Sequence, residues 1–328
     1  MILILLLFTL LLSPSEQGTN VTTITSPSPF QVFQRSADDT GSILISGHVE
    51  TTGEYSVSAT WNGFESGVLW QGDTPDFSAE WAGLPVWQSD LIVTVGGESY
   101  TVPNVGIGDI YIIAGQSNAV GHGNNYQMYT NTLGLRGSMF AYDGWKELAD
   151  PTGIRADDSN AGGSIWPLLA TYMLERGVPV AFVPTAKNST SVNHWQPGQA
   201  LYEDMHARIA QLPAPYARAV LWQQGEYDAQ IHMTANAYAT KLENIADALY
   251  ADFGLPLYAA YLSNYVYTPY SATINQGITK AISERAYIYL GAGLHAMSPN
   301  LPNVHYLTDV KLQKEADKWF TSLAVFYP

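Results

Sequence analysis

Hydrophobic and polar positions follow two different rhythms along this chain of 328 residues. From about residue 28 to 104, short runs alternate apolar and polar residues, with Gly, Asp and Asn between them, as in SILISGHV, EYSVSATW, DLIVTVGG and ESYTVP. Alternation with a period of two, interrupted by turn residues, is typical of antiparallel strands that bury one face. This part of the sequence predicts a small β-sandwich.

After residue 106 the apolar runs become nearly continuous, which is expected of parallel strands covered on both faces. Strands are predicted at DIYIIAG, VPVAFVPT, ARAVLWQQG, LPLYAAYLS and AYIYLG. Between and after them, apolar residues recur at helical spacing. They mark helices at Ser164 to Gly177, Tyr202 to Leu212, Tyr238 to Leu249 and Leu312 to Leu323. This alternation predicts a three-layer α/β domain.

The chain begins with an apolar run, MILILLLFTLLL. As a helix it would span about 18 Å, less than the roughly 30 Å of a bilayer core. Small residues follow at positions 13 and 15, so we expect residues 1–18 to be a signal peptide and the protein to be secreted, although no Lys or Arg precedes the run. The alternative is a hydrophobic first strand. The predicted organisation is a signal peptide 1–18, a β-sandwich domain 19–105 and an α/β domain 106–328.

Charge narrows the choice of partners. The net charge is −15, with 14 Lys and Arg in total and no basic cluster, which argues against nucleic acid and against an anionic membrane surface. After cleavage of the signal peptide, no stable membrane anchor is expected. The sequence has no cysteine, so the fold requires no disulfide.

One stretch, GDIYIIAGQSNAVGHG, carries the first candidate for chemistry. In an open parallel sheet, ligands bind at the carboxyl ends of the strands, and Ser117 follows such an end. Gly115 permits a sharp turn that leaves the hydroxyl at the rim. A serine placed in this way can act as a nucleophile if a base accepts its proton. Taken alone, a serine after a strand is far more often a helix cap than a nucleophile.

Other polar residues are predicted at the same rim. AGGSIWPLLA places Gly162 and Gly163 before a helix, and LWQQGEYDA places Gln224 and Glu226 after a buried strand. His305, in NVHYLTDVK, precedes the last helix and is the natural general base. The remaining histidines that we considered are scattered, so we expect them to be structural or exposed and propose no zinc site: His122, His194, His206, His232 and His295.

These segments together resemble a known family. VGIGDIYIIAGQSNA, GGSIWPLLA, AKNSTSVNHWQPG, VLWQQGEYDA and NVHY are similar, in order and spacing, to the motif blocks of the SGNH hydrolase superfamily, and most similar to its sialate O-acetylesterases and acetylxylan-type carbohydrate esterases. The resemblance spans roughly residues 98 to 325. It implies a flavodoxin-like α/β/α domain after a β-domain, and a serine esterase that removes acetyl groups from O-acetylated glycans without a metal or other cofactor.

The resemblance also implies roles for single residues. Ser117 matches the nucleophile, and His305 matches the base that later protonates the leaving alcohol. The backbone N–H of Ser117, a glycine of the Gly162–Gly163 pair (Gly163 is preferred) and the side-chain amide of Gln224 match the oxyanion donors. We expect three residues to contact the substrate: Gln116, Asn118 and Trp195.

The sequence departs from the family pattern at the catalytic acid. Members carry an Asp two or three residues before the catalytic His, where this chain has Pro302 and Asn303. Glu226 is the favoured replacement and Asp309 is the alternative. The usual Gly-Gly-Thr of the third block is also changed, to Asn-Ser-Thr at 188–190, which affects the acyl pocket and leaves the substrate preference open.

Two other functions remain open. One is a carbohydrate-binding protein with an esterase fold and impaired catalysis, because the usual acid is missing. The other is a lipid or thioester hydrolase of the same superfamily.

Overall fold

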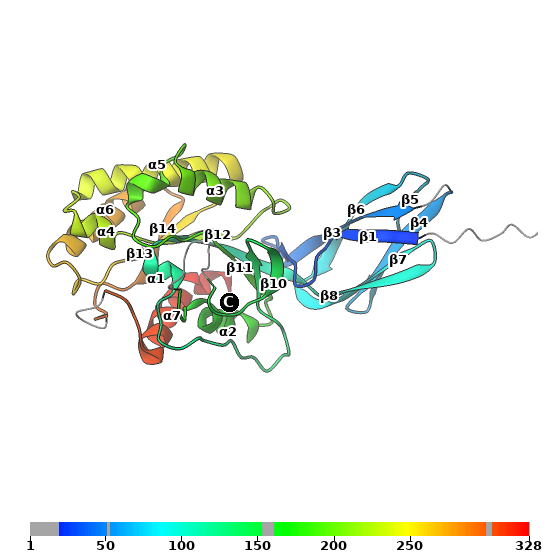
Figure 1. Cartoon of the computed structure of the whole chain (residues 1–328), viewed down its shortest axis with the longest axis horizontal. Helices are drawn as coiled ribbons and strands as arrows, with labels where there is room; N and C mark the ends of the chain where they lie inside the picture. The colour runs from blue at the N-terminus through cyan, green and yellow to red at the C-terminus, as the bar shows by residue number, and fades with distance from the viewer. Residues whose placement is uncertain (1–19, 51–52, 153–160, 300–303, 328) are drawn as a thin grey trace, which may run out of the picture.

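The computed structural model describes residues 20–50, 53–152, 161–299 and 304–327, so the predicted signal peptide and Asn303 lie outside the described residues. A single long strand, β8 (Glu98–Gly115), runs through the molecule. Its first half pairs antiparallel with β7 (Trp87–Val95), and its second half pairs parallel with β11 (Val180–Pro184) and β12 (Ala219–Gln223). A β-rich part and an α/β part therefore lie at opposite ends of β8 (Figure 1). Residues 105 and 106, where we predicted the domain boundary, lie within this strand.

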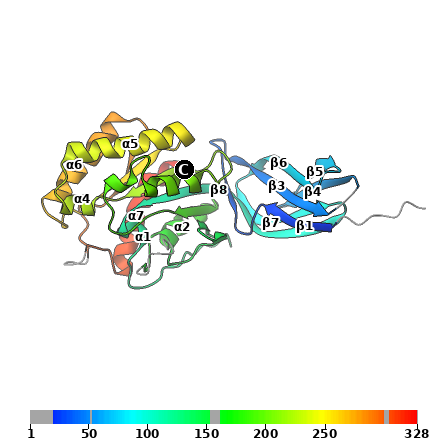
Figure 2. The same cartoon turned by 45° about the horizontal axis from the view of Figure 1, so that its top comes forward.

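The β-rich part contains two sheets that share one hydrophobic core. One sheet has the order β1 (Asn20–Ser26), β3 (Thr40–Glu50), β6 (Asp76–Pro85). In the other, β5 (Phe64–Gly72) pairs with β4 (Tyr55–Trp61), β4 with β7 and β7 with β8, while the short β2 (Val32–Gln34) pairs with β8. Ile43, Trp61 and Val93 come from three strands and are all buried in this core. The four predicted runs correspond to β3, β4, β7 and the start of β8 (Figure 2).

The α/β part is built on a sheet of order β10-β9-β11-β8-β12-β13-β14. Its remaining strands are β9 (Ser138–Ala141), β10 (Gly144–Glu147), β13 (Leu257–Tyr261) and β14 (Ile288–Gly293). Only β10 runs antiparallel to its neighbour. The five continuous apolar runs of the sequence correspond to β8, β11, β12, β13 and β14.

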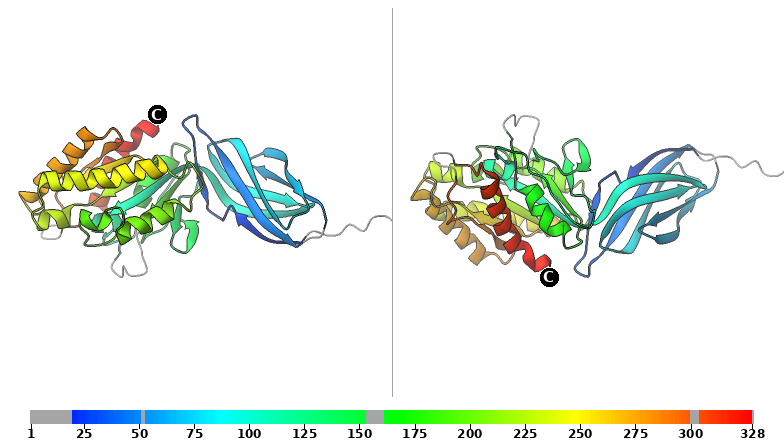
Figure 3. Two further views of the ribbon diagram at one scale, coloured as in Figure 1. Left: turned by 90° about the horizontal axis from the view of Figure 1, so that it is seen from above. Right: turned by 90° about the horizontal axis from the view of Figure 1, so that it is seen from below.

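Helices cover both faces of this sheet. On one face lie α2 (Trp166–Leu174) and α7 (Asp309–Leu323), and on the other lie α3 (Ala200–Ile209), α5 (Ala235–Phe253) and α6 (Tyr270–Glu284) (Figure 3). Alternate residues of β8 face the two layers: Tyr111 packs in the cluster of α2 and α7, and Ile112 in the cluster of the other three helices. The mixed α/β architecture with a large sheet agrees with the sequence prediction.

Helix α6 is the main element that the sequence analysis missed. Its sequence, YSATINQGITKAISE, contains Gly277 in mid-helix, and glycine lowers helix propensity by about 1 kcal/mol. The structure explains the glycine, since an added Cβ at Gly277 would lie 2.7 Å from the Ala235 carbonyl oxygen on α5. Close packing of two helices therefore overrides local propensity here.

A buried ion cluster lies where the two parts meet. Asp109 of β8 has no solvent exposure, and its carboxylate accepts hydrogen bonds from Arg35 (Nη2, 2.9 Å) and Arg218 (Nε, 2.9 Å). Burial raises the pKa of this carboxyl, but the two guanidinium groups outweigh it and the net pKa is lowered. The cluster links the segment after β2, the middle of β8 and the start of β12. Among the described helices, none is both long and apolar enough to cross a membrane.

Candidate active site

The nucleophile candidate lies where β8 ends. Gly115 has φ +130°, and an added Cβ would lie 2.0 Å from the carbonyl oxygen of Gln223, so only glycine fits beside β12. The chain then turns directly into a one-turn helix, α1 (Ser117–Val120), with Ser117 in its first position. This helix lies at the edge of the sheet that faces away from the β-rich part (Figure 1). The turn fixes the position of Ser117 at the carboxyl edge of the sheet.

The segment that carries His305 lies beside the segment that carries Ser117. Asn118 Nδ2 lies 3.4 Å from the carbonyl oxygen of Val304, and the backbone N–H of Asn124 donates to Leu307 over 2.8 Å. The imidazole of His305 stacks on His122, with ring centroids 4.3 Å apart and an angle of 8° between the planes. Two stretches nearly 200 residues apart in sequence therefore meet at one edge of the sheet.

Within the described ranges, the Ser117 hydroxyl and His305 are not joined by a hydrogen bond. Contacts between nucleophile and base are often long in unliganded enzymes and tighten in the substrate complex. The described geometry therefore brings the two segments together without closing the contact that proton transfer requires.

The environment of His305 favours its neutral form. Burial is the main reason, and the nearby His122 is the second; together they lower the pKa of His305 to about 4. An imidazole with this pKa is uncharged at neutral pH, and a neutral imidazole can accept a proton from a serine hydroxyl.

Glu226 begins α4 (Glu226–Gln230) and is 7% exposed. Its Oε1 accepts a hydrogen bond from Asn118 Nδ2 over 2.8 Å, while its Oε2 is buried with no partner in the described part of the chain. Burial raises the pKa of this carboxyl, which Asn118 only partly offsets. The expected direct hydrogen bond from the His305 ring to Glu226 is not formed, because the carboxylate is held by Asn118 instead. The alternative acid, Asp309, accepts from Asn125 (3.1 Å) and Gln127 (2.9 Å) and is not a partner of the imidazole either.

Two of the expected oxyanion donors are already used within the fold. The side-chain amide of Gln224 donates to the Thr190 carbonyl oxygen (2.7 Å) and to Asp228 (2.5 Å). The backbone N–H of Gly163 donates to the Gly123 carbonyl oxygen over 2.9 Å. The assignment of these two groups as oxyanion donors stays a prediction, because the sequence shows which groups can donate but not which acceptors they meet.

The start of α1 supplies the remaining donors. The backbone N–H groups of Ser117 and Asn118 have no acceptor among the described residues. This is the normal state of the first turn of a helix, whose N–H groups lack intrahelical partners. They are the groups that can face a negative charge next to the Ser117 hydroxyl.

The predicted substrate contacts fare differently. Trp195 is completely buried, donates through Nε1 to Thr190 Oγ1 (3.1 Å) and packs edge-on against Trp222, so the prediction that it stacks on a sugar is wrong. Gln116 is 4% exposed, and its side-chain oxygen Oε1 accepts a hydrogen bond from Gln224 Nε2 over 3.1 Å. Asn118 donates its side-chain N–H to Glu226 Oε1, as described above.

The sequence analysis also missed a residue. We expected His122 to be structural or exposed, yet its ring lies flat against His305 and its Nε2 is 2.8 Å from Asn188 Oδ1. The stack joins positions 122 and 305, which are far apart in the sequence. The one sequence signal for a role of His122 in the site is that it lies five residues after Ser117. Within the ranges that the structure describes, no three His, Asp or Glu side chains are grouped as a metal site requires.

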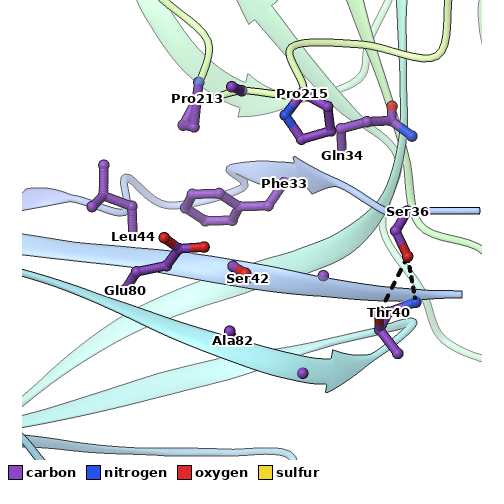
Figure 4. Close-up of a pocket in the computed structure, with 13 residues that line it drawn as sticks. Phe33, Gln34, Ser36, Thr40, Ser42, Leu44, Glu80, Ala82, Pro213 and Pro215 are labelled. Carbon is purple, nitrogen blue, oxygen red and sulfur yellow. Dashed lines mark hydrogen bonds between the residues drawn. The ribbon is translucent and has the colours of Figure 1, made fainter. Parts of the chain in front are cut away.

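A cavity of about 630 Å³ lies elsewhere, between the β-rich part and the segment Pro213–Pro215 (Figure 4). Phe33 and Leu44 form apolar walls, and Ser42 and Glu80 contribute polar groups. None of its lining residues belongs to the segments around Ser117, His122 and His305, so it is not part of the candidate site.

Comparison with known proteins points to one enzyme class. A family model described as carbohydrate esterase, sialic acid-specific acetylesterase, matches residues 107–319, which is more than half of the chain. A probable carbohydrate esterase of Arabidopsis thaliana is 24% identical over 169 residues, which are 45% of this chain and 65% of that protein, so less than two thirds of the relative's length is matched.

Two solved structures share the fold. The Arabidopsis thaliana protein has a TM-score of 0.54 at 20% identity, covering 66% of this chain and 98% of its own. A carbohydrate acetylesterase from Xanthomonas citri has a TM-score of 0.61 at 17% identity, covering 93% of this chain and 75% of its own. The second match includes most of the β-rich part.

Proposed function

Because this chain belongs to the family of carbohydrate esterases described as sialic acid-specific acetylesterases, we propose that it removes acetyl groups from sugar hydroxyls through a serine acyl-enzyme. The observation that carries the proposal is the meeting of the Ser117 helix with the His305 segment at the carboxyl edge of the sheet. The proposal includes the finer assignment that the α/β part is an SGNH-type three-layer domain and the β-rich part a sandwich.

The first step follows from the positions of three groups. The acetyl carbonyl lies against the start of α1, where Ser117 Oγ attacks its carbon and His305 takes the hydroxyl proton. The carbonyl oxygen then becomes an anion. The N–H groups of Ser117 and Asn118 point to that position and stabilise the charge, an effect typically worth a factor of about 10²–10³ in rate for one donor.

The second half of the reaction returns the enzyme to its starting state. Protonated His305 gives its proton to the oxygen of the leaving sugar alcohol, and the acetyl group remains on Ser117 as an ester. His305 then takes a proton from water, the resulting hydroxide attacks the acyl carbon, and acetate leaves as Ser117 regains its proton from His305.

Glu226 supports the site indirectly in this proposal. Asn118 connects the Glu226 carboxylate with the carbonyl oxygen of Val304, the residue before His305. The carboxylate therefore positions the segment that carries the base.

We further propose that the substrate is an O-acetylated glycan outside the cell. The family description and the carbohydrate esterase and acetylesterase names of the similar proteins support the class of substrate. The apolar run at residues 1–12 supports secretion. The strongly negative net charge is compatible with neutral sugars and unfavourable for nucleic acid.

The proposal is tested by hydrolysis of 4-nitrophenyl acetate and by acetate release from O-acetylated sialic acid and acetylated xylo-oligosaccharides. We expect turnover in the intact protein and its loss in Ser117→Ala, with glycan binding retained. Equal release by both proteins contradicts the proposal and favours a sugar-binding role. A series of 4-nitrophenyl esters with longer acyl chains separates the lipid or thioester alternative, for which long chains, not acetate, are the best substrates.

A further inference from the structure

His122 is the one imidazole beside the proposed base that the mechanism above leaves without a role. It lies two residues beyond the end of α1, and its ring stacks on that of His305, with the centroids 4.3 Å apart and 8° between the planes. In a stack this close and this parallel, the His122 ring lies against one face of the His305 ring. It restricts rotation of the imidazole about its side-chain bonds, which an acid normally does by hydrogen bonding to the ring.

His122 is itself anchored. Its Nε2 lies 2.8 Å from Asn188 Oδ1, and because an amide oxygen can only accept, Nε2 must carry the hydrogen. Asn188 lies in the loop after β11, at the same edge of the sheet. The stack is therefore fixed from outside by a third segment of the chain.

Two stacked imidazoles oppose each other's protonation. A second positive charge a few ångströms from the first is unfavourable in a half-buried site, and like charges are known to separate the titrations of paired groups. His122 contributes in this direction to the lowered pKa of His305, after the larger contribution of burial.

The other ionisable groups of the neighbouring elements are held elsewhere. Glu226 of α4 is bonded to Asn118, and Asp309 of α7 is bonded to Asn125 and Gln127. Glu315 of α7 accepts from Gln223, and Lys187 lies in the loop that also carries Asn188. None of these groups contributes to the shift of His305, whereas His122 does.

We propose that His122 is a positioning residue for the base: anchored on Asn188, it holds the His305 ring flat and, by charge repulsion, keeps it in the neutral form that accepts the Ser117 proton. This inference rests on the proposed function for its catalytic meaning. It also implies that activity persists into the acidic range.

The test compares two replacements of the same ring. His122→Phe keeps a flat ring against His305 but cannot be charged, and His122→Ala removes the ring. We expect the acid limb of kcat/KM against pH to move to higher pH in His122→Phe, by about half a unit or more. We expect a lower alkaline plateau of kcat in His122→Ala than in His122→Phe, because only the first loses the stack.

A matched control is His232→Phe. His232 also stacks on an aromatic ring, that of Tyr270 at 3.7 Å, but lies outside the candidate site. We expect its pH profile to equal that of the unmodified protein. An acid limb in His122→Phe that coincides with the unmodified protein, or equal plateaus in the Phe and Ala variants, overturns the inference.

A measurement without catalysis separates this inference from the proposed function. NMR titration of the imidazole Cε1–H signals gives the pKa of His305 directly in the unmodified protein and in His122→Phe. A pKa that rises in the variant supports the coupling even if the protein hydrolyses no acetyl ester. An unchanged pKa refutes the coupling even if Ser117→Ala abolishes hydrolysis.

Discussion

Asn118 connects the Glu226 carboxyl with the carbonyl oxygen of Val304, and we predict that the stability lost on removing Asn118 depends on pH. Asn118→Ala removes a hydrogen bond of 2.8 Å to a carboxylate that is 7% exposed and whose second oxygen has no partner in the described part of the chain. Hydrogen bonds to charged groups contribute about 1.5–3 kcal/mol, and neutral ones about 0.5–1.5 kcal/mol. The larger figure applies where Glu226 is ionised and the smaller where it is protonated.

The direction of this pH dependence follows from the raised pKa of Glu226. Below its ordinary value of 4.5 the carboxyl is protonated in both the folded and the unfolded chain, and only a neutral hydrogen bond is lost. As pH rises through the raised folded pKa, the buried carboxylate forms and depends on Asn118, so the loss grows. We expect Asn118→Ala to lower stability by about 0.5–1.5 kcal/mol at pH 4 and by about 1.5–3 kcal/mol at a pH above the raised pKa of Glu226.

Thermal unfolding followed by circular dichroism measures this difference. One kcal/mol shifts the Tm of a domain of 150–250 residues by about 2–4 °C, so we expect a fall of about 3–12 °C above the raised pKa of Glu226 and about 1–6 °C at pH 4. In a Glu226→Gln background the loss at the two pH values should be equal, since no carboxylate forms. Equal losses in the unmodified background, or the same pH dependence in both, refute the reasoning.

The remaining predictions concern the charge of Glu226, the buried Trp195 and the ion cluster around Asp109. Glu226→Gln should lower kcat by about 10-fold, because replacing the carboxylate that binds Asn118 by a neutral amide weakens the hydrogen bond that positions the His305 segment by about 1–1.5 kcal/mol. Asn303→Ala should change kcat much less, and comparable kcat values for Glu226→Gln and the unmodified protein would remove the carboxylate from the mechanism. Trp195→Ala should destabilise the protein by about 3–5 kcal/mol in chemical denaturation, while Trp195→Phe should leave KM for acetylated sugars unchanged; a selective rise in KM for the Phe variant would restore the tryptophan as a substrate contact. Arg218→Met should cost about 3–5 kcal/mol of stability at pH 7, because it leaves Asp109 incompletely paired. Since the pKa of Asp109 is lowered, that loss should fade as pH drops below its ordinary value of 3.8, and kcat of the folded fraction should not change; a loss that is equal at pH 3 and pH 7 would contradict the assignment.

The sequence predicted the parts of the fold that a repeating pattern encodes. Five continuous apolar runs became β8, β11, β12, β13 and β14, and four stretches of helical spacing became α2, α3, α5 and α7. It missed α6, whose mid-helix Gly277 serves a close approach to α5, and the last two strands at one side of the sheet, β9 and the edge strand β10, which are only four residues long. Packing between distant segments decides these elements, and a local pattern does not record it.

In the candidate site, too, the sequence predicts what a local pattern encodes and misses contacts between distant segments. The positions of Ser117 and His305 follow from strand ends and chain order, which the sequence displays. The partners of Gln224, Gly163 and Trp195 depend on which buried acceptor or ring lies opposite each of them, which the sequence does not display; the expected stacking of Trp195 on a sugar was wrong for this reason. The stack of His122 on His305 is likewise a contact between distant positions.

The central claim is that Ser117 is an activated nucleophile that forms a covalent acyl-enzyme. The most direct measurement is reaction with diethyl 4-nitrophenyl phosphate, an ester that phosphorylates activated serines, followed by peptide mass spectrometry. The account predicts one diethylphosphoryl group on Ser117, loss of acetyl ester hydrolysis in proportion to labelling, and no labelling of Ser117 in His305→Ala. A protein that hydrolyses acetyl esters while Ser117 remains unlabelled would contradict it.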